Sequence, residues 1–246
     1  MTESYGPLAA SYDALTGDVP YGEFADYYEK LLSREGKDNL TLLDLCCGTG
    51  TLTYMMAERG HEMIGVDLSE EMLSVAAEKL GGFTGGVKPM FLCQEASELD
   101  LFGTVEGAYC SLDGMNYLPP EELPEVFRRL HLFIEPGGKF AFDFHSPEHL
   151  RSLDGGTFVD EDEDMLCLWR AEFDEEECAL IYGMDIFRRK GRFWERECEE
   201  HVEFVHEPEA LCELLESCGF ADVRLLTDGP RHEEGRLYIV ATNLEH

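Results

Sequence analysis

The sequence predicts an α/β protein with a seven-stranded, mostly parallel sheet, helices on both faces of that sheet, and an inserted antiparallel β-meander. The first observation is that extended and helical segments alternate from residue 39 to residue 145, which indicates a parallel sheet covered by helices. The second is that residues 157–206 contain three extended runs separated by turn residues, which is typical of a meander. The chain has 246 residues, of which 44% are hydrophobic, so one large domain with a substantial core is expected.

The elements of the parallel part follow one another in regular order. Ahead of them, apolar residues at helical spacing predict a helix at Glu23–Leu32. Ser69 has the side chain of a helix N-cap, whereas Gly60 and the pair Gly137-Gly138 each end a helix. The expected strands are Leu40–Cys46, Glu62–Asp67, Val87–Cys93, Val105–Leu112 and Lys139–Phe144, and the helices between them are Thr51–Arg59, Glu70–Leu80 and Pro119–Ile134.

The second half of the chain departs from this alternation. Its extended runs are Leu166–Phe173, Ala179–Arg188 and Arg192–Val205, and they are followed by a helix at 208–218 and a closing pair of strands at Asp222–Leu226 and Arg236–Ala241. We therefore divide the chain into an N-terminal helical lid segment at 1–38, a main domain at 39–156 and 207–243, and the inserted meander at 157–206. The meander is also our candidate surface for a homodimer.

Composition narrows the classes of partner. The formal net charge is −33, from 52 acidic and 19 basic side chains, so most of the surface repels DNA or RNA. The nine cysteines are an odd number without any C-x-x-C spacing, which favours reduced thiols and a cytoplasmic protein. No apolar run approaches the roughly 20 residues that a membrane-spanning helix needs, and we expect no membrane partner.

The strongest local signal is the segment Leu43-Asp44-Leu45-Cys46-Cys47-Gly48-Thr49-Gly50, where the first strand passes into the following helix. Gly48 and Gly50 permit tight backbone angles and a close approach of a ligand to the main chain. The N-terminus of the helix offers free N–H groups to a carboxylate. Asp44 can accept hydrogen bonds from an ammonium group, so the segment suits an amino-acid head group.

Three further polar segments follow successive strands. Asp67 ends the second strand, where an acid can accept hydrogen bonds from both ribose hydroxyls; a helix cap is the competing interpretation. Residues 93–96 follow the third strand, where polar groups can contact adenine, and residues 111–117 follow the fourth. Together these segments predict a nucleoside cofactor. NAD is the alternative, but its fingerprint asks for a third glycine or alanine where this chain has Thr53.

In this order the segments LDLCCGTG, VDLS, QEAS, LDGMNYL and PGGKFAFDF resemble those of the class I S-adenosylmethionine-dependent methyltransferases, over roughly residues 38–145. The resemblance implies a Rossmann-like fold, methyltransferase activity and S-adenosylmethionine as the cofactor. Narrower features, among them Tyr12-Asp13 and Arg196-x-x-Glu199-x-His201, resemble a subgroup of small bacterial methyltransferases of uncertain substrate. The cofactor-binding residues that the resemblance implies are Tyr12, Tyr21, Asp44, Cys46, Gly48, Thr49, Gly50, Asp67, Leu68, Met72, Gln94, Glu95, Ala96, Ser111, Asp113, Asn116 and Tyr117.

Two positions depart from the family pattern. Cys46 stands where the family's loop usually has glycine or alanine, and Glu106-Gly107 replaces the aspartate that often opens the fourth strand. Cys46 is small, so we expect cofactor binding to survive it.

Methyl transfer needs donor and acceptor held in line and shielded from water. It requires no metal, and we expect no metal site. A nitrogen or oxygen acceptor that carries a proton needs a general base, and the candidates are Asp113, His145 and His201. The alternative for His201 is an exposed face of the meander, which it shares with the acidic residues 195, 197 and 199 at period two. The alternative for His145 is a simple loop histidine.

We expect a small-molecule methyl acceptor, whose identity and methylated atom the sequence leaves open. The alternatives are an RNA-modifying methyltransferase, which the charge disfavours, and a catalytically silent cofactor-binding protein. The segment from Tyr5 to Tyr28, with Tyr12 and Tyr21, is expected to lie near the mouth of the cofactor site as a lid that excludes water.

Overall fold

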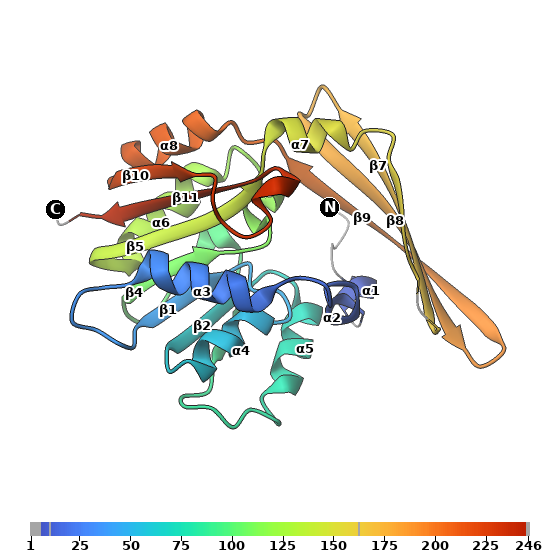
Figure 1. Ribbon diagram of the computed structural model, residues 1–246, viewed down its shortest axis with the longest axis horizontal. Coiled ribbons are helices and arrows are strands. Elements are labelled where there is room, and N and C mark those ends of the chain that lie inside the picture. The colour runs from blue at the N-terminus through green and yellow to red at the C-terminus, as the bar shows by residue number, and fades with distance from the viewer. Residues whose placement is uncertain (1–5, 10, 162, 245–246) are drawn as a thin grey trace.

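The protein folds as two β-sheets of different character, which we describe from a computed structural model covering residues 6–9, 11–161 and 163–244 (Figure 1). The larger sheet carries helices on both faces, and the smaller one lies at its side. Tyr5 and the rest of the first five residues lie outside the described residues.

The larger sheet has seven strands in the order β10-β11-β5-β4-β1-β2-β3. Strands β1 to β5 are parallel, and β11 is antiparallel to both β5 and β10, which confirms the predicted sheet and its closing pair. The strand order reverses between β1 and β4, and ligands of such sheets bind outside the carboxyl ends of the strands at that point. The strands are β1 (Thr41–Leu45), β2 (Glu62–Asp67), β3 (Met90–Cys93), β4 (Val105–Cys110), β5 (Ile134–His145), β10 (Phe220–Leu226) and β11 (Arg236–Asn243).

Each face of this sheet has its own apolar core, because successive side chains of a strand point to opposite faces. Leu42 packs with apolar residues of α3 and α4, whereas Leu43 packs with those of α6 and α8. The predicted cover on both faces is therefore confirmed. The helices are α3 (Tyr21–Leu32), α4 (Thr51–Glu58), α5 (Glu70–Lys79), α6 (Leu123–Phe133) and α8 (Pro208–Ser217).

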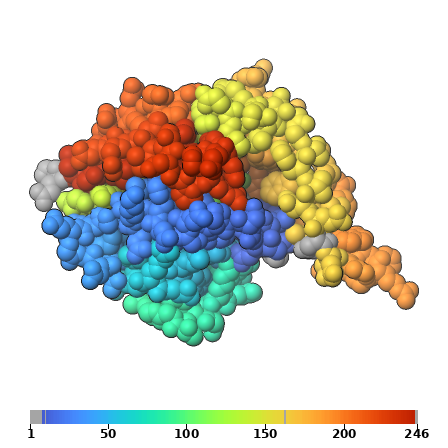
Figure 2. All heavy atoms as spheres, viewed as in Figure 1, coloured from blue at the N-terminus to red at the C-terminus, as the bar shows by residue number. Residues whose placement is uncertain are grey.

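The smaller sheet is the predicted antiparallel meander, with one strand more than the three expected. Its order is β6-β7-β8-β9, with every neighbouring pair antiparallel. The strands are β6 (Thr157–Glu161), β7 (Met165–Asp174), β8 (Ala179–Lys190) and β9 (Phe193–Phe204). The hairpin between β8 and β9 projects free of the body in Figure 2, and Phe193 at its tip is 77% exposed.

Two expectations at element boundaries were wrong. Gly137 and Gly138 do not separate a helix from a strand, because β5 begins at Ile134 and runs through both. A Cβ on Gly138 would lie 2.6 Å from the carbonyl oxygen of Glu106, so glycine is needed where β5 passes irregularly alongside β4. The helix expected from Pro119 begins at Leu123, because the residues before it form a turn.

Short helices that the sequence did not indicate join the two sheets. α7 (Pro147–Ser152) follows β5 and is capped by Ser146, whose hydroxyl accepts a hydrogen bond from the His149 N–H. α1 (Gly6–Ala9) and α2 (Tyr12–Leu15) lie between the body and the meander in Figure 1, and α1 packs against α5 and β9. No helix among the described residues is long and apolar enough to cross a membrane.

Candidate functional site

The turn after β1 is built from left-handed backbone conformations. Cys46, Gly48 and Gly50 all have positive φ angles, of 58°, 54° and 73°. A Cβ on Gly50 would lie 2.9 Å from the ring of Phe91, so this position needs glycine. A Cβ on Gly48 would meet no atom within 4 Å, so open space borders the turn there. The turn is therefore tightly packed at Gly50 and open to a ligand at Gly48.

Asp67 braces this turn from the end of β2. Its carboxylate accepts hydrogen bonds from the backbone N–H groups of Gly48, at 2.7 Å, and of Ser69, at 2.9 Å. Ser69 caps α5 by accepting from the Met72 N–H at 3.2 Å. Asp67 thus contributes to the start of α5, as the cap interpretation expects. Each carboxylate oxygen of Asp67 has a second lone pair that can accept another hydrogen bond. The contact of Asp67 with ribose is therefore compatible with these bonds and stays a prediction.

Asp44 lies buried beneath the turn, with one carboxylate oxygen unused. Oδ2 accepts hydrogen bonds from the hydroxyls of Thr53, at 2.5 Å, and Tyr109, at 2.9 Å. Oδ1 is buried without a hydrogen-bond partner in the described part of the chain. Burial raises the pKa of Asp44 to about 7, Thr53 and Tyr109 oppose that rise, and the charge of Asp67 adds to it. An unpaired buried carboxylate oxygen fits an ammonium donor from a ligand.

The N-terminal segment reaches the same turn. Asp13 of α2 accepts a hydrogen bond from the Thr49 hydroxyl at 2.6 Å and pairs with Lys79 of α5 at 2.7 Å. Tyr12 is half-buried near Asp113 and Asp67; burial first, and then Tyr21 and these two carboxylates, raise its pKa. Tyr21 donates a hydrogen bond to Thr16 at 3.1 Å. The structure therefore brings Tyr12 to the predicted site, and Asp13 with it.

A charged cluster of five side chains occupies the carboxyl ends of β4 and β5. Its members are Asp113, Asp143, His145, Glu203 and Arg236. Asp143 is fully buried and accepts hydrogen bonds from the backbone N–H groups of residues 112 and 113, both at 3.0 Å. It also accepts from the Tyr28 hydroxyl and pairs with Arg236. Asp143 therefore fixes the loop that presents Asp113.

Arg236 and Glu203 hold His145 between them. Arg236 Nη2 lies 2.8 Å from Asp113 Oδ1 and 3.0 Å from His145 Nε2, while His145 Nδ1 lies 3.2 Å from Glu203 Oε2. Burial, the largest influence, lowers the pKa of His145, but Asp113 and Glu203 together raise it above its ordinary value. Burial also raises the pKa of Glu203. His145 is thus part of an ordered network and not a simple loop histidine.

The same cluster has the spacing of a metal site. Ligand atoms of Asp113, His145 and Glu203 all lie within 4.8 Å of one another. The guanidinium of Arg236, however, already contacts both Asp113 and His145. A divalent ion there would face this fixed positive charge at close range, so we assign no metal.

Asn116 fastens the meander to the main sheet at this point. Its side-chain oxygen accepts from the His145 N–H at 2.8 Å, and its amide donates to the Phe204 carbonyl at 2.9 Å. Asn116 is fully buried and lies in the short helix η2 (Gly114–Tyr117). The sequence predicted that Asn116 contacts the cofactor, whereas the structure shows it joining two parts of the protein.

The exposed-face alternative for His201 is wrong. The inner half of β9 faces the body, so Glu199, His201 and Glu203 are all buried, although the outer half of the strand is exposed. His201 Nε2 lies 3.1 Å from Glu199 Oε1, and the ring of Tyr117 stands perpendicular to the imidazole at 5.9 Å. The period-two pattern predicted which residues share one face of β9, but it did not predict that the main body covers the second half of that face.

The remaining predicted residues lie at the ends of β2, β3 and β4, except Met72, which lies in the first turn of α5. Gln94 uses both ends of its side chain on the backbone of Asp100, at 3.0 and 3.2 Å, so it braces its own loop. Leu68 is 64% exposed and Glu95 is exposed. Met72, Ala96 and Ser111 are buried.

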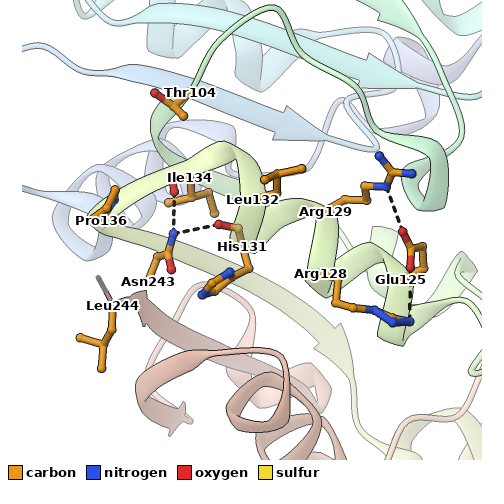
Figure 3. A pocket seen from close by; sticks show the side chains of 10 residues that line it. All are labelled: Thr104, Glu125, Arg128, Arg129, His131, Leu132, Ile134, Pro136, Asn243 and Leu244. Carbon is orange, nitrogen blue, oxygen red and sulfur yellow. Dashed lines mark hydrogen bonds and ion pairs between the residues drawn. The ribbon is translucent and has the colours of Figure 1, made fainter. Parts of the chain in front are cut away.

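The pocket in Figure 3 lies away from this chemistry. It has a volume of about 450 Å³ and is lined by residues that include Thr104, Ile134 and Asn243. These stand just before β4, at the start of β5 and at the end of β11, which is the opposite edge of the sheet from Asp113 and His145. Asn243 closes it by donating to the carbonyls of His131 and Ile134. This pocket carries no part of the predicted site.

Sequence reasoning missed Asp143, Glu203 and Arg236. Asp143 had a local signal, since it is an acid inside the apolar strand KFAFDF. Glu203 had a weaker one, because it continues the period-two row of His201. Arg236 had none, since it is only the first residue of the last strand.

Comparisons with known proteins agree on the class of this chain. A model for a methyltransferase domain matches residues 42–138. A Bacillus subtilis (strain 168) protein whose name describes it as a methyltransferase, YqeM, is 32% identical over 244 residues, which cover 96% of each chain. A solved S-adenosylmethionine-dependent methyltransferase from Clostridium acetobutylicum ATCC 824 has a TM-score of 0.82 at 27% identity, covering 98% of this chain and 99% of that one. The sugar N-methyltransferase KedS8 from Streptoalloteichus sp ATCC 53650 shares the fold, with a TM-score of 0.78 at 20% identity over 100% of this chain and 94% of its own.

Proposed function

The chain belongs to the class I S-adenosylmethionine-dependent methyltransferases, and we propose that it methylates a small-molecule acceptor bound where the two sheets meet. When bound, S-adenosylmethionine supplies an electrophilic methyl group on a sulfonium sulfur. The protein must place the acceptor in line with that methyl group, exclude water and receive any proton that the acceptor loses.

The residues after β1 and β2 fit this cofactor. The unpaired Oδ1 of Asp44 suits its ammonium group, and the N–H groups at the start of α4 suit its carboxylate. Open space beside Gly48 leaves room for a ligand against the backbone. Asp67, at the end of β2, is our candidate for the ribose hydroxyls.

The main support for an acceptor site is the charged cluster of Asp113, Asp143, His145, Glu203 and Arg236. It lies at the carboxyl ends of the strands, as do the residues that fit the cofactor. Asp113 follows β4 and His145 is the last residue of β5. Tyr12 is near enough to both Asp113 and Asp67 for their charges to raise its pKa. We assign the proton-accepting role to His145 or Asp113, with His201 lining the site from β9. α1 packs against both α5 and β9, and such cover beside the carboxyl ends of the strands suits a small molecule better than a polymer.

Similar folds and the charge favour the same acceptor class. Solved structures with this fold include the sugar N-methyltransferase KedS8, although at 20% identity that likeness concerns the fold alone. The net charge of −33 opposes binding of RNA over most of the surface. A nitrogen and an oxygen acceptor are both compatible with a histidine base.

Incubation with methyl-labelled S-adenosylmethionine and a fractionated cell extract tests the proposal. We expect label in the metabolite fraction, and a strong loss of label with His145→Gln. The control is Glu200→Gln, which removes a charge from the exposed outer face of β9. Label confined to the RNA fraction would contradict the proposed acceptor class. Equal labelling by His145→Gln and the control would exclude His145 as the base.

A further inference from the structure

We propose that Glu203, contributed by the meander, is the positioning residue that makes His145 the general base of the methyl transfer. This inference rests on the proposed function, because it names the partner that the proposed base requires. Neither the predicted site residues nor the family pattern includes Glu203.

The side chain of Glu203 reaches from the smaller sheet to the larger one. It lies in β9 and is 4% exposed, and its carboxylate contacts a histidine at the end of β5. Asn116 locks the neighbouring residue, Phe204, to the same place through its carbonyl. A buried carboxylate is retained only where a partner compensates for its lost hydration. The side chain of His145 is that partner.

The contacts of His145 determine which ring nitrogen carries the proton. An arginine guanidinium donates hydrogen bonds and accepts none. Arg236 Nη2 lies 3.0 Å from His145 Nε2, so Nε2 must offer its lone pair. The proton of the neutral ring is therefore on Nδ1, where it is donated to Glu203 Oε2 at 3.2 Å. This assignment follows from the chemistry of both partners and leaves Nε2 as the basic atom.

The groups facing His145 oppose one another in charge. Glu203 from β9 and Asp113 from the loop after β4 favour the imidazolium, whereas Arg236 from β11 opposes it. His149 from α7, whose ring lies 4.7 Å from that of His145, adds no charge near neutral pH, because burial and then the charges of His145 and Arg236 lower its pKa to about 4. Asp143 lies behind Arg236 and neutralises part of its charge. Tyr182 from β8 stays neutral, because burial raises its pKa. His145 can thus be a neutral base at rest and an imidazolium after it takes a proton.

The proton balance of the reaction is simple. The acceptor's N–H or O–H proton moves to His145 Nε2 as the acceptor atom bonds to the methyl carbon. The carbon–sulfur bond breaks, and its electron pair stays on sulfur, which leaves a neutral thioether. Arg236 gives up its hydrogen bond to Nε2 when Nε2 becomes protonated, because both groups are then donors, and it keeps its contacts with Asp113 and Asp143. Glu203 stabilises the new positive charge through Nδ1, as a carboxylate does for a histidine base in hydrolases.

Nuclear magnetic resonance of the histidine rings tests the pairing without any acceptor. His145 is identified among the eight histidines by the signal that His145→Gln removes. We expect nitrogen shifts of the Nδ1-protonated form in the wild type. Glu203→Gln keeps an oxygen acceptor but loses the charge, so the pKa of His145 should fall by about one unit or more. Glu203→Asp should restore part of the loss, and Glu200→Gln should change nothing.

The pH profile of methyl transfer tests the consequence, with whichever extract fraction accepts label. A neutral base is needed, so the rate of the wild type should rise with pH through the pKa of His145. In Glu203→Gln that rise should move to lower pH, and the plateau should drop because the base is weaker. A purely structural residue would lower the rate equally at every pH.

The two proposals fail in different ways. If metabolites accept label but Glu203→Gln leaves the pKa of His145 and the pH profile unchanged, the role of Glu203 is refuted and the proposed function stands. If only RNA accepts label while the histidine shifts and pH profile behave as expected, the proposed acceptor class is refuted and the role of Glu203 stands.

Discussion

Replacing Asp67 by alanine should weaken cofactor binding and also lower stability, because the structure gives this carboxylate two kinds of work. It accepts backbone hydrogen bonds from Gly48 and Ser69, and we propose that it also accepts from the ribose hydroxyls. Hydrogen bonds to a charged acceptor contribute roughly 1.5–3 kcal/mol. Since 1.4 kcal/mol corresponds to about a tenfold change in affinity, Asp67→Ala should raise the dissociation constant about ten- to a hundredfold.

The cost to stability should be smaller than the cost to binding. Ser69 still caps α5 through its hydroxyl, so the loss resembles that of a single cap, about 1 kcal/mol. For a chain of this length that corresponds to a fall in melting temperature of roughly 2–4 °C. A melt of the protein without cofactor measures this change separately from binding.

Calorimetric titration separates a direct contact with ribose from an indirect effect through the turn. S-adenosylhomocysteine and an analogue without the two ribose hydroxyls are each titrated into the wild type and Asp67→Ala. If Asp67 grips the hydroxyls, the variant should bind the analogue as well as the wild type does. If the variant loses the same factor with both ligands, Asp67 acts only by bracing Gly48, and our assignment is refuted.

Three further changes have expected outcomes at other positions. The pKa of Asp44 is raised to about 7 from its ordinary 3.8, so cofactor affinity should increase as pH rises through about 7. Asp44→Asn should abolish this dependence of affinity on pH. An equal dependence in both proteins would exclude Asp44 as the partner of the ammonium group. The same shift favours folding below pH 4 and is lost as pH rises through 7, so urea titrations of Asp44→Asn should show a flatter stability profile over that range. Asp143→Asn leaves Arg236 without its fully buried partner and should lower the free energy of unfolding by about 3–5 kcal/mol in urea titration; a loss below 1 kcal/mol would show that Asp113 alone compensates. Asp13→Asn should speed hydrogen exchange of the amides of α2, and cofactor should slow it less than in the wild type; unchanged exchange would contradict the lid role.

The parts of this protein that the sequence predicts are those set by neighbouring residues. The bounds of β2, the cap at Ser69 and the tight turn at Gly48 depend on a few adjacent positions, and the structure has all of them. Parallel strands also bring their carboxyl ends to one edge of the sheet, so the sequence alone predicts that Asp67 lies near Gly48.

The parts that could not be predicted depend on distant segments. His145 and Glu203 are 58 residues apart, and Asp113 and Arg236 are 123 apart. No periodicity states that the inner half of β9 turns toward the main sheet while the outer half stays exposed. That choice is made by tertiary contacts such as the one from Asn116 to Phe204, and it decides whether a row of acids is a solvated face or a buried site.

The N-terminal segment connects the cofactor site with the proposed acceptor site. At one end the Leu8 N–H donates to Glu199 of β9 at 2.9 Å, and the Leu8 side chain packs with apolar residues of β7 and β8. At the other end Asp13 contacts the turn after β1 and pairs with Lys79. Leu8 and Asp13 are only five positions apart, so we expect opening of the segment at one site to disturb its contacts at the other. We propose that the meander supplies more than Glu203, because it gives the N-terminal segment a second surface: closing over a bound cofactor would also fix the strand that carries the partner of His145.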